Sequence, residues 1–291
     1  MNKPGSACSS TELDSIRHFI RMALQEDVGE GDHTSLACIK PGIAGKARLL
    51  VKEKGILAGQ DLAGMIFQAV DPALQVSFFI LDGAAIQPGD CILEVQGDEQ
   101  NILKAERLVL NCMQRMSGIA STTSLYANRI AGTKAKVLDT RKTTPGMRIL
   151  EKWAVRIGGG TNHRMGLYDM ILIKDNHVDY AGGIGKAIAA ANDYLVKTKK
   201  KLEIEIEVRN FDELDQVLET GGIQRIMLDN FSPENLATAV KKINGRYKTE
   251  ASGGITIDTI LSYAISGVDY ISVGALTHSV KSLDLSLKAV R

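Results

Sequence analysis

The sequence predicts a two-domain α/β protein, in which a small α+β domain precedes a barrel-like domain of alternating strands and helices. Short strand patterns separated by turn residues occupy roughly residues 45–98. Beyond residue 130, six apolar strand patterns alternate with amphipathic helical patterns, an order typical of parallel βαβ units. Because a complete barrel of this kind has eight strands, the second domain is predicted to be an incomplete barrel.

Length and composition are those of an ordinary globular protein. The chain has 291 residues, of which 44% are hydrophobic and 24% charged, and its formal net charge is +1. It can therefore form one barrel-sized domain or two smaller ones. The near-neutral charge gives no indication of a nucleic-acid or membrane surface, so we expect neither as a partner.

The start of the chain and the cysteines bear on the cellular compartment. The stretch MNKPGSACSSTELDS is polar and lacks the apolar segment of a secretory signal. No run approaches the roughly 18 apolar residues of a membrane span. The cysteines lie too far apart for a metal knuckle or a redox pair: Cys8, Cys38, Cys91 and Cys112. These features predict a reduced, cytoplasmic protein.

The first domain begins with a predicted amphipathic helix over residues 9–28, where Ser9 and Glu12 have capping-box spacing. The runs GKARLLVKEKGILAGQ, LQVSFFILDGAAI and DCILEVQG that follow are β-type and separated by turn residues. Among them, DLAGMIFQAV predicts a helix. This part of the chain therefore reads as a small α+β domain.

A long helical pattern connects the two domains. It runs from about residue 100 to residue 130, and we expect an interruption near Ser117-Gly118. The domain boundary is placed at this interruption. The first domain is then residues 1–117 and the second residues 118–275, and the tail 276–291 is expected to pack back on the first domain.

The six strand patterns of the second domain are KVLDT, DMILIK, LEIEIEV, RIMLD, YKTEA and VDYISVG. In βα barrels, active-site groups gather at the carboxyl ends of the strands, because the loops there converge on one mouth. Here the first two strands end in cations, the next two in acids, and the last two in small glycine-containing turns. These residues are Arg141, Lys142, Lys174, Glu207, Asp229, Ser252, Gly253, Gly254 and Gly274.

The cations predict an anion-binding site. Arginine binds carboxylates as a planar fork, and lysine supplies a compact point charge. Several such groups at one mouth imply a ligand with more than one acidic group, although each residue alone also fits a solvated loop or helix charge. The expected set is Arg141, Lys142, Arg148, Arg156, His163, Arg164 and Lys174.

The acids at the next two strand ends are Glu207 and Asp229, which also fit a reading as surface acids. In LEIEIEV, however, Glu203, Glu205 and Glu207 alternate onto one face. If that face lines a barrel interior, not all three can be structural. Paired carboxylates beside an anion site indicate either a hard cation such as Mg²⁺ or the stabilisation of developing positive charge.

The last strand ends suggest a phosphate cradle. Backbone N–H groups of glycine turns after the final barrel strands commonly bind phosphate, although Ser252-Gly253-Gly254 and Gly274 also fit simple tight turns. The run GGIGKA at 182–187 lacks the spacing of a phosphate loop and is read as a helix entry. His278 lies just past the last strand, where a lone histidine is by default a core or surface residue.

Six segments of the chain resemble, in order and spacing, the quinolinate phosphoribosyltransferase family, also called nicotinate-nucleotide pyrophosphorylase (carboxylating). They are DTRKTTPGMR, GGGTNHRMGLYDMILIKDNH, EIEVRNFDEL, IMLDNFSPE, EASGGI and ISVGALTHS. The similarity runs from the first helix almost to the C-terminus and includes LVLNCMQRMSGIAS. It implies the type II phosphoribosyltransferase fold, an N-terminal open-faced α/β sandwich and a C-terminal incomplete, TIM-like α/β barrel. It also implies a homodimer or higher oligomer, in which the neighbour's N-terminal domain completes each active site.

The resemblance implies roles for residues at matching motif positions. The quinolinate carboxylates would meet Arg141, His163, Arg164 and Lys174, with Arg107 supplied by the other subunit. Lys142 and His278 would lie near phosphoribosyl pyrophosphate, whose ribose and Mg²⁺ would be served by Glu207 and Asp229. Its 5′-phosphate would be held by the backbone of Ser252, Gly253, Gly254 and Gly274. Three of these residues are assigned to catalysis: Lys142, Glu207 and Asp229.

The implied activity is that of a glycosyltransferase of the pentosyltransferase class in de novo NAD biosynthesis. It would join the phosphoribosyl group to quinolinate with decarboxylation, giving nicotinate mononucleotide, pyrophosphate and CO2. Mg²⁺ would accompany phosphoribosyl pyrophosphate, and no organic cofactor is needed because the alkylated pyridine nitrogen is itself an electron sink. The alternatives are a transferase for another pyridine acid, a molybdate-transport-associated paralogue, and a non-catalytic phosphosugar-binding barrel. A non-catalytic barrel would have little reason to keep Glu207 and Asp229 beside the cations.

Overall fold

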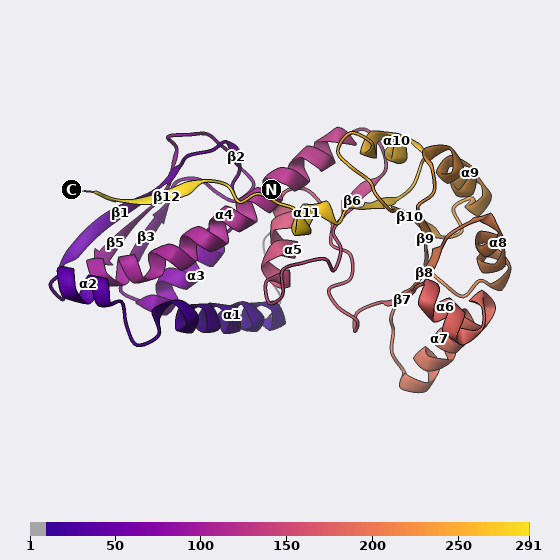
Figure 1. Cartoon of the computed structure of the whole chain (residues 1–291), viewed down its shortest axis with the longest axis horizontal. Coiled ribbons are helices and arrows are strands. Elements are labelled where there is room, and N and C mark those ends of the chain that lie inside the picture. Colours follow the sequence, from indigo (N-terminus) through magenta and orange to yellow (C-terminus); the bar gives the residue numbers. More distant parts are fainter. Residues whose placement is uncertain (1–9, 291) are drawn as a thin grey trace. The chain divides into compact units, whose positions relative to one another are not determined.

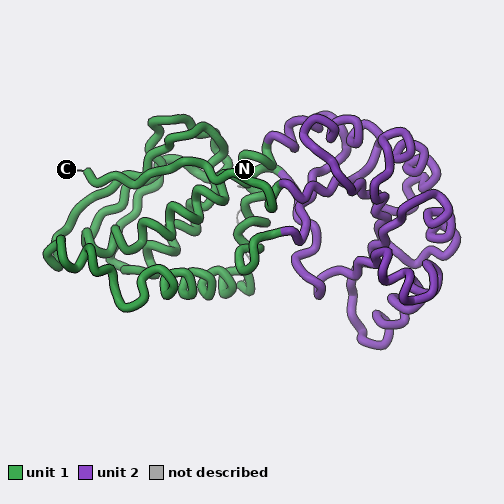
Figure 2. The backbone as a smooth tube through the Cα atoms, viewed as in Figure 1, with its two compact units in different colours: residues 1–124, 143–159, 276–291 green, residues 125–142, 160–275 purple. Residues whose placement is uncertain are grey.

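The structure is a computed structural model that describes residues 10–290, and it divides the chain into two compact units (Figure 2). Unit 1 comprises residues 1–124, 143–159 and 276–291, and unit 2 comprises residues 125–142 and 160–275. This division differs from the expected boundaries at 117/118 and 275/276, because it places residues 118–124 and 143–159 in unit 1 as well. The N-cap expected at Ser9 lies outside the described residues.

Unit 1 is built on an antiparallel sheet with the strand order β12-β1-β5-β3. Along β1 the side chains alternate, so that Ala47, Leu49 and Val51 are buried. On the other face Arg48 is exposed and pairs with Glu94 at 2.8 Å. A sheet with one apolar and one charged face needs a covering layer on one side only. The strands are β1 (Ala44–Val51), β3 (Gln75–Phe78), β5 (Cys91–Asp98) and β12 (Leu285–Val290).

Helices supply the covering layer of unit 1 (Figure 1). The helix predicted from DLAGMIFQAV is present as α3 and buries Leu62, Ala63, Ile66 and Phe67. A short two-stranded sheet of β2 and β4 is separate from the main sheet. The bounds are α1 (Ser10–Val28), α2 (His33–Cys38), β2 (Gly55–Ile56), α3 (Gln60–Val70), β4 (Ala85–Ile86), α4 (Glu99–Arg129) and α5 (Arg148–Ile157).

The predicted interruption of the long helix is wrong, because α4 runs unbroken from Glu99 to Arg129. Ser117 and Gly118 serve packing instead. The Ser117 hydroxyl donates to the carbonyl of Ala58 and accepts from its N–H, at 3.2 and 3.0 Å. At Gly118 a β-carbon would collide with the carbonyl oxygen of Lys281. The Ser-Gly pair therefore marks close approach of two other segments to the helix, which local sequence does not reveal.

Substituting Gly118 with alanine is expected to lower the free energy of unfolding by about 2 kcal/mol, because a backbone atom blocks the new methyl group. The matched control is Gly185→Ala in helix α7 (Ile184–Thr198), where the nearest atom to a new β-carbon is 3.6 Å away. That change should stabilise by roughly 0.5 kcal/mol, since alanine loses less backbone entropy than glycine on folding. Urea titrations of both variants measure the two signs, and destabilisation of equal size would contradict the packing argument.

Unit 2 contains a six-stranded sheet in which every neighbouring pair is parallel, in the order β6-β11-β10-β9-β8-β7. All six strands predicted from the sequence are present, and the predicted incomplete barrel is confirmed (Figure 1). The strands are β6 (Lys136–Leu138), β7 (Ile171–Ile173), β8 (Ile204–Val208), β9 (Arg225–Asp229), β10 (Lys248–Ser252) and β11 (Tyr270–Ser272).

Helices alternate with the strands of unit 2 and begin at recognisable caps. Asn210 caps α8 by accepting from the N–H of Glu213, and Ser232 caps α9 in the same way ahead of a proline. The helix entry predicted at GGIGKA is confirmed, since Gly182 ends α6 and Gly183 precedes α7. The helices are α6 (Asp175–Ala181), α7, α8 (Phe211–Thr220), α9 (Pro233–Ile243) and α10 (Ile260–Ile265).

An irregular segment occupies the free edge of β6. Thr161 forms an isolated parallel bridge with Leu138, donating to the Val137 carbonyl at 2.8 Å and accepting from the Asp139 N–H at 3.2 Å. This segment therefore takes the position of a further strand beside β6. The residues that follow it, Asn162 to Arg164, are held at the side of the barrel that lacks regular strands.

No helix between residues 10 and 290 combines the length and the apolar character needed to cross a membrane.

Cys38, Cys91 and Cys112 carry free thiols, and burial raises the pKa of Cys112 to about 12. Packing rather than reactivity is therefore the role that its surroundings indicate for Cys112.

Candidate active site

A cavity of about 180 Å³ lies at the carboxyl ends of the strands in unit 2. Its lining combines loop residues after β6, residues of the 163–164 segment, and the last residues of several strands. The lining residues are Thr140, Arg141, Lys142, His163, Arg164, Leu172, Lys174, Met227, Glu250, Ser252 and Ser272. Leu172 and Met227 give it an apolar part, and most of the remaining residues are polar or basic.

The cavity brings together most of the cations predicted from the sequence: Arg141, Lys142, His163, Arg164 and Lys174. Arg148 and Arg156 are not among its lining residues. Both lie on α5 in unit 1, where Arg148 donates to the Thr143 hydroxyl at 3.0 Å and Arg156 lies 3.8 Å from Glu12. Arg148 and Arg156 lie near opposite ends of this ten-residue helix, and sequence order alone does not show whether either one reaches the cavity.

Arg164 is the most deeply placed of the cavity arginines, with 9% of its surface exposed. Its guanidinium donates to the carbonyl of Met170 at 3.3 Å. Burial and the neighbouring charge of Arg141 lower the pKa of Arg164 below its usual range. A crowded, partly desolvated pair of arginines is electrostatically costly without an anion between them.

Glu207 and Asp229 occupy the carboxyl ends of β8 and β9, as predicted. Glu207 accepts from the ammonium of Lys174 at 2.7 Å, and 10% of its side chain is exposed. Asp229 accepts from the side-chain amide of Asn230 at 2.6 Å. Neither acid belongs to a cluster of three or more ligand side chains in the described part of the chain. Carboxylate oxygens are ligands that Mg²⁺ prefers, and an ion held by only two of them would take its other ligands from water or from a bound molecule.

The turn after β10 has a backbone that favours glycine. Gly253 and Gly254 adopt φ angles of +104° and +59°. A β-carbon on Gly253 would also collide with the side-chain oxygen of Asn230. The turn can therefore bring main-chain N–H groups close to a ligand, in the way that phosphate cradles require.

Besides Glu207, Asp229 and the two turn glycines, three further predicted residues are not among the lining residues of the cavity, and two of these three belong to unit 1. Arg107 is an exposed residue of α4. His278 ends the short helix α11 (Ala275–His278) and is exposed, with Nδ1 2.6 Å from the Ser279 hydroxyl. Gly274 follows β11 in unit 2, one residue before α11.

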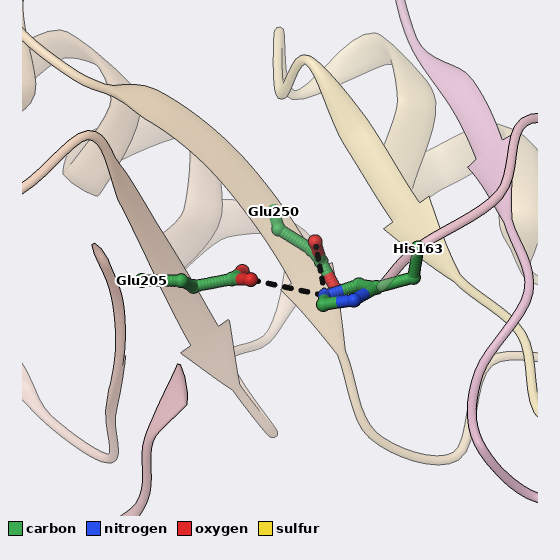
Figure 3. Close-up of side chains that lie close together, drawn as sticks. All are labelled: His163, Glu205 and Glu250. Carbon is green, nitrogen blue, oxygen red and sulfur yellow. Dashed lines mark ion pairs between the residues drawn. The ribbon is translucent and has the colours of Figure 1, made fainter. Parts of the chain in front are cut away.

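A buried ionic cluster that the sequence did not predict joins His163 to two acids of the parallel sheet (Figure 3). Glu205 on β8 and Glu250 on β10 have no exposed surface. Nε2 of His163 lies 3.0 Å from a Glu205 oxygen and 3.4 Å from a Glu250 oxygen. The guanidinium of Arg225 approaches the same two acids, at 4.0 and 3.1 Å. Two carboxylates thus share one imidazole and one guanidinium.

Burial alone would lower the pKa of His163, but the hydrogen bonds and charges of Glu205 and Glu250 outweigh it and raise the pKa to about 9. Burial and the charge of Glu250 raise the pKa of Glu205 to about 7. Burial would also raise the pKa of Glu250, yet His163, Ser272 and Arg225 lower it. The backbone N–H of Arg164 donates to Nδ1 of His163 at 2.7 Å. Because Nδ1 accepts this hydrogen bond, the ring proton is assigned to Nε2, which faces the acids.

Part of this cluster could have been found in the sequence. Glu205 belongs to the alternating LEIEIEV pattern, which places it on the same face as Glu207 and one pleat deeper. Glu250 interrupts a short strand pattern, and a charge in the middle of a buried strand normally has a partner. The partners come from distant segments, so the sequence pattern does not identify them.

Comparisons with known proteins match both parts of the chain. The family model described as the quinolinate phosphoribosyl transferase N-terminal domain matches residues 32–117, and the C-terminal domain model of that family matches residues 119–288. A Nicotiana glauca protein named quinolinate phosphoribosyltransferase [decarboxylating] 2, mitochondrial, is 48% identical over 288 residues, covering 94% of this chain and 82% of its own. The nicotinate-nucleotide pyrophosphorylase [carboxylating] of Mycobacterium leprae is 41% identical, covering 96% of this chain and 99% of its own. The structure of the nicotinate-nucleotide pyrophosphorylase from Francisella tularensis superposes with a TM-score of 0.89 at 38% identity and full coverage of both chains.

Proposed function

We propose, because the chain belongs to the quinolinate phosphoribosyltransferase family, that it transfers the phosphoribosyl group of phosphoribosyl pyrophosphate to quinolinate with loss of CO2. The products are nicotinate mononucleotide, pyrophosphate and CO2, and the reaction supplies a nucleotide for NAD biosynthesis. The observation that carries this proposal is the cavity of unit 2, which gathers five basic side chains, Arg141, Lys142, His163, Arg164 and Lys174, at one mouth. A ligand with two carboxylates balances such a site better than a ligand with one.

Quinolinate is proposed to bind against Arg141, His163, Arg164 and Lys174, with Arg107 supplied by a second copy of the chain. The exposure of Arg107 supports this last assignment, since an exposed arginine is available to a partner. Leu172 and Met227 are suited to the faces of the pyridine ring. Basic groups on the edges of the ring and apolar groups on its faces would fix its orientation.

Phosphoribosyl pyrophosphate is proposed to lie toward Lys142, His278 and the strand-end acids Glu207 and Asp229. These acids would bind the ribose hydroxyls and the Mg²⁺ ion of the diphosphate. The turn formed by Ser252, Gly253 and Gly254, together with the backbone of Gly274, is suited to the 5′-phosphate. The left-handed backbone of this turn supports the assignment.

The reaction follows from positioning and charge. When bound to the diphosphate, Mg²⁺ would neutralise negative charge on the leaving group. Lys142 would stabilise the departing pyrophosphate, and Glu207 and Asp229 would stabilise the positive charge that develops on the ribose. The pyridine nitrogen of quinolinate then attacks the anomeric carbon. As CO2 leaves, the electron pair of the C2–carboxylate bond stays on C2, where the positive charge of the adjacent alkylated nitrogen stabilises it. A proton from water then binds C2 to give nicotinate mononucleotide, so no organic cofactor is needed.

The proposed activity is tested by incubating the protein with quinolinate, phosphoribosyl pyrophosphate and Mg²⁺, and by following CO2 and pyrophosphate. The expected result is equal release of both products. Nicotinate in place of quinolinate should give little turnover, because one carboxylate leaves part of the cation set unpaired. Turnover of nicotinate alone would indicate a transferase for another pyridine acid, and binding without turnover of any pyridine acid would indicate a phosphosugar-binding barrel.

Replacing Glu207 or Asp229 with alanine is expected to reduce kcat about 100- to 1000-fold, since each removes a charge that acts on the developing cation. The fold should persist, because both residues lie at strand ends on the cavity side. Steady-state rates with both substrates saturating give kcat, and circular dichroism reports the fold. Glu203→Ala, an exposed acid on the same stretch of chain, is the control that should keep the wild-type rate. Wild-type rates in both strand-end variants would remove the two acids from the mechanism.

A further inference from the structure

We propose that Glu205 and Glu250 are positioning residues for the quinolinate site. They hold the imidazole of His163 between two strands, and His163 in turn fixes the backbone from which Arg164 reaches the ligand. This inference rests on the proposed function, and it assigns a task to two acids that neither touch the substrates nor bind the metal in that scheme.

The segment that carries His163 and Arg164 has no regular secondary structure of its own, so its position depends on side-chain anchors. One anchor is Asp139, a buried residue just beyond β6. It accepts from the backbone N–H of His163 at 2.9 Å and from the side-chain amide of Asn162. Asp139 therefore fixes the start of the segment at the β6 edge.

The second anchor acts on the imidazole. Glu205 and Glu250 come from β8 and β10, which flank β9 in the sheet, and both point at Nε2 (Figure 3). On the opposite side of the ring, Nδ1 accepts from the backbone N–H of Arg164 at 2.7 Å. The imidazole thus links the acids on β8 and β10 to the main chain of Arg164 and holds that main chain in place. Loss of an acid would release the ring and with it the guanidinium above.

Two buried acids close to a site for a dianion would repel the ligand unless nearby cations neutralised them. Arg225 lies 3.1 Å from Glu250 and stacks over the ring of Tyr270 at 4.5 Å from its centre. The hydroxyl of Ser272 also donates to Glu250. When His163 is protonated and both acids are ionised, two cations balance two anions inside the cluster. Arg141 and Arg164 are then not needed as counter-ions for Glu205 and Glu250, and their charge is available to the ligand.

His163, Glu205 and Glu250 also offer three ligand atoms within 4.8 Å of one another, a spacing that a metal ion could use. The guanidinium of Arg225 argues against this use, because it already lies against both acids. A divalent ion beside it would face direct repulsion in a buried site. The geometry favours a balanced ionic cluster that positions a loop.

The test compares Glu205→Gln and Glu250→Gln with the exposed Glu203→Gln as the matched control. The KM and the calorimetric Kd for quinolinate should rise about 10- to 100-fold in the two cluster variants, because the guanidinium loses its fixed position. The KM for phosphoribosyl pyrophosphate should change by less than about threefold, since that substrate is not held by Arg164. Glu203→Gln should match the wild type in all three values. Thermal unfolding of each variant reports the fold.

A second arm asks whether Glu205 acts through His163. His163→Gln should itself weaken quinolinate binding, and adding Glu205→Gln to it should cause little further loss, because the link is already broken. Effects that multiply in the double variant would overturn the inference, and so would an equal rise in the KM of both substrates. If Glu205→Gln does not fold, Glu205→Asp decides by the same criteria, because it keeps the charge and withdraws it from Nε2. An inactive wild type would contradict the proposed function, whereas an active wild type with unchanged quinolinate KM in the variants would contradict only this inference.

Discussion

Replacing Arg164 with methionine is expected to lower kcat/KM for quinolinate about 1000-fold. Arg164 as a whole is 9% exposed, so a carboxylate that meets its guanidinium competes with little water. Removing one partner of such a pair typically costs about 2–5 kcal/mol, which is the basis for this magnitude. The effect should appear in both KM and kcat, because the arginine both binds the pyridine ring and orients its nitrogen toward the sugar.

The control for this prediction is Arg164→Lys, which keeps the charge but loses the planar fork. We expect an intermediate loss of about 30-fold, since a lysine replaces two parallel hydrogen bonds by one. Steady-state kinetics with quinolinate varied at saturating phosphoribosyl pyrophosphate gives both values. Equal activity of the methionine and lysine variants would show that the charge is not used. Wild-type activity in the methionine variant would place the carboxylates elsewhere in the cavity.

Much of the fold could be predicted from local pattern. All six strands of unit 2 and the helix α3 match their sequence patterns, because period-two and period-3.6 apolar repeats describe a single element. The error at Ser117-Gly118 has a non-local cause. Those residues make room for Lys281 and bind Ala58, which are distant in the chain, and a local reading of Ser-Gly can only suggest a break.

The candidate site shows the same division. The strand-end cations Arg141, Lys142 and Lys174 could be predicted, because parallel strands deliver their carboxyl ends to one mouth. The buried ionic cluster around Glu205 and Glu250 could not be predicted. The task of Glu250 becomes visible only when His163 and Arg225 lie beside it, and those neighbours come from two other segments.

The arrangement of charges in the buried cluster and in the cavity bears on which pyridine acid the site prefers. The buried acids are balanced within their own cluster by His163 and Arg225, whereas burial, together with the charge of Arg141, lowers the pKa of Arg164. A second carboxylate on the ligand relieves this repulsion, and a single carboxylate relieves only part of it. Discrimination between a pyridine dicarboxylate and a monocarboxylate can thus arise from repulsion in the empty site as well as from contacts in the filled one.

Mixing two inactive variants, Arg107→Ala and Lys174→Ala, is expected to restore activity. In the proposed dimer each site takes Lys174 from one subunit and Arg107 from the other. A mixed dimer then has one site in which both changes fall together and one site that is intact. With random reassortment half of the dimers are mixed, so the recovered rate should approach about a quarter of the wild-type rate.

The measurement needs exchange of subunits, which mild denaturant and dilution can provide, and mass spectrometry of tagged copies to count mixed dimers. The matched control is a mixture of Lys174→Ala with Arg164→Met, because both changes fall on residues that line the cavity of the same unit. In that mixture every site of a mixed dimer keeps one defect, so no activity should return. Recovery in the first mixture alone supports a site built from two chains. Absence of recovery, with mixed dimers present in the expected proportion, would mean that Arg107 acts within its own chain or not at all.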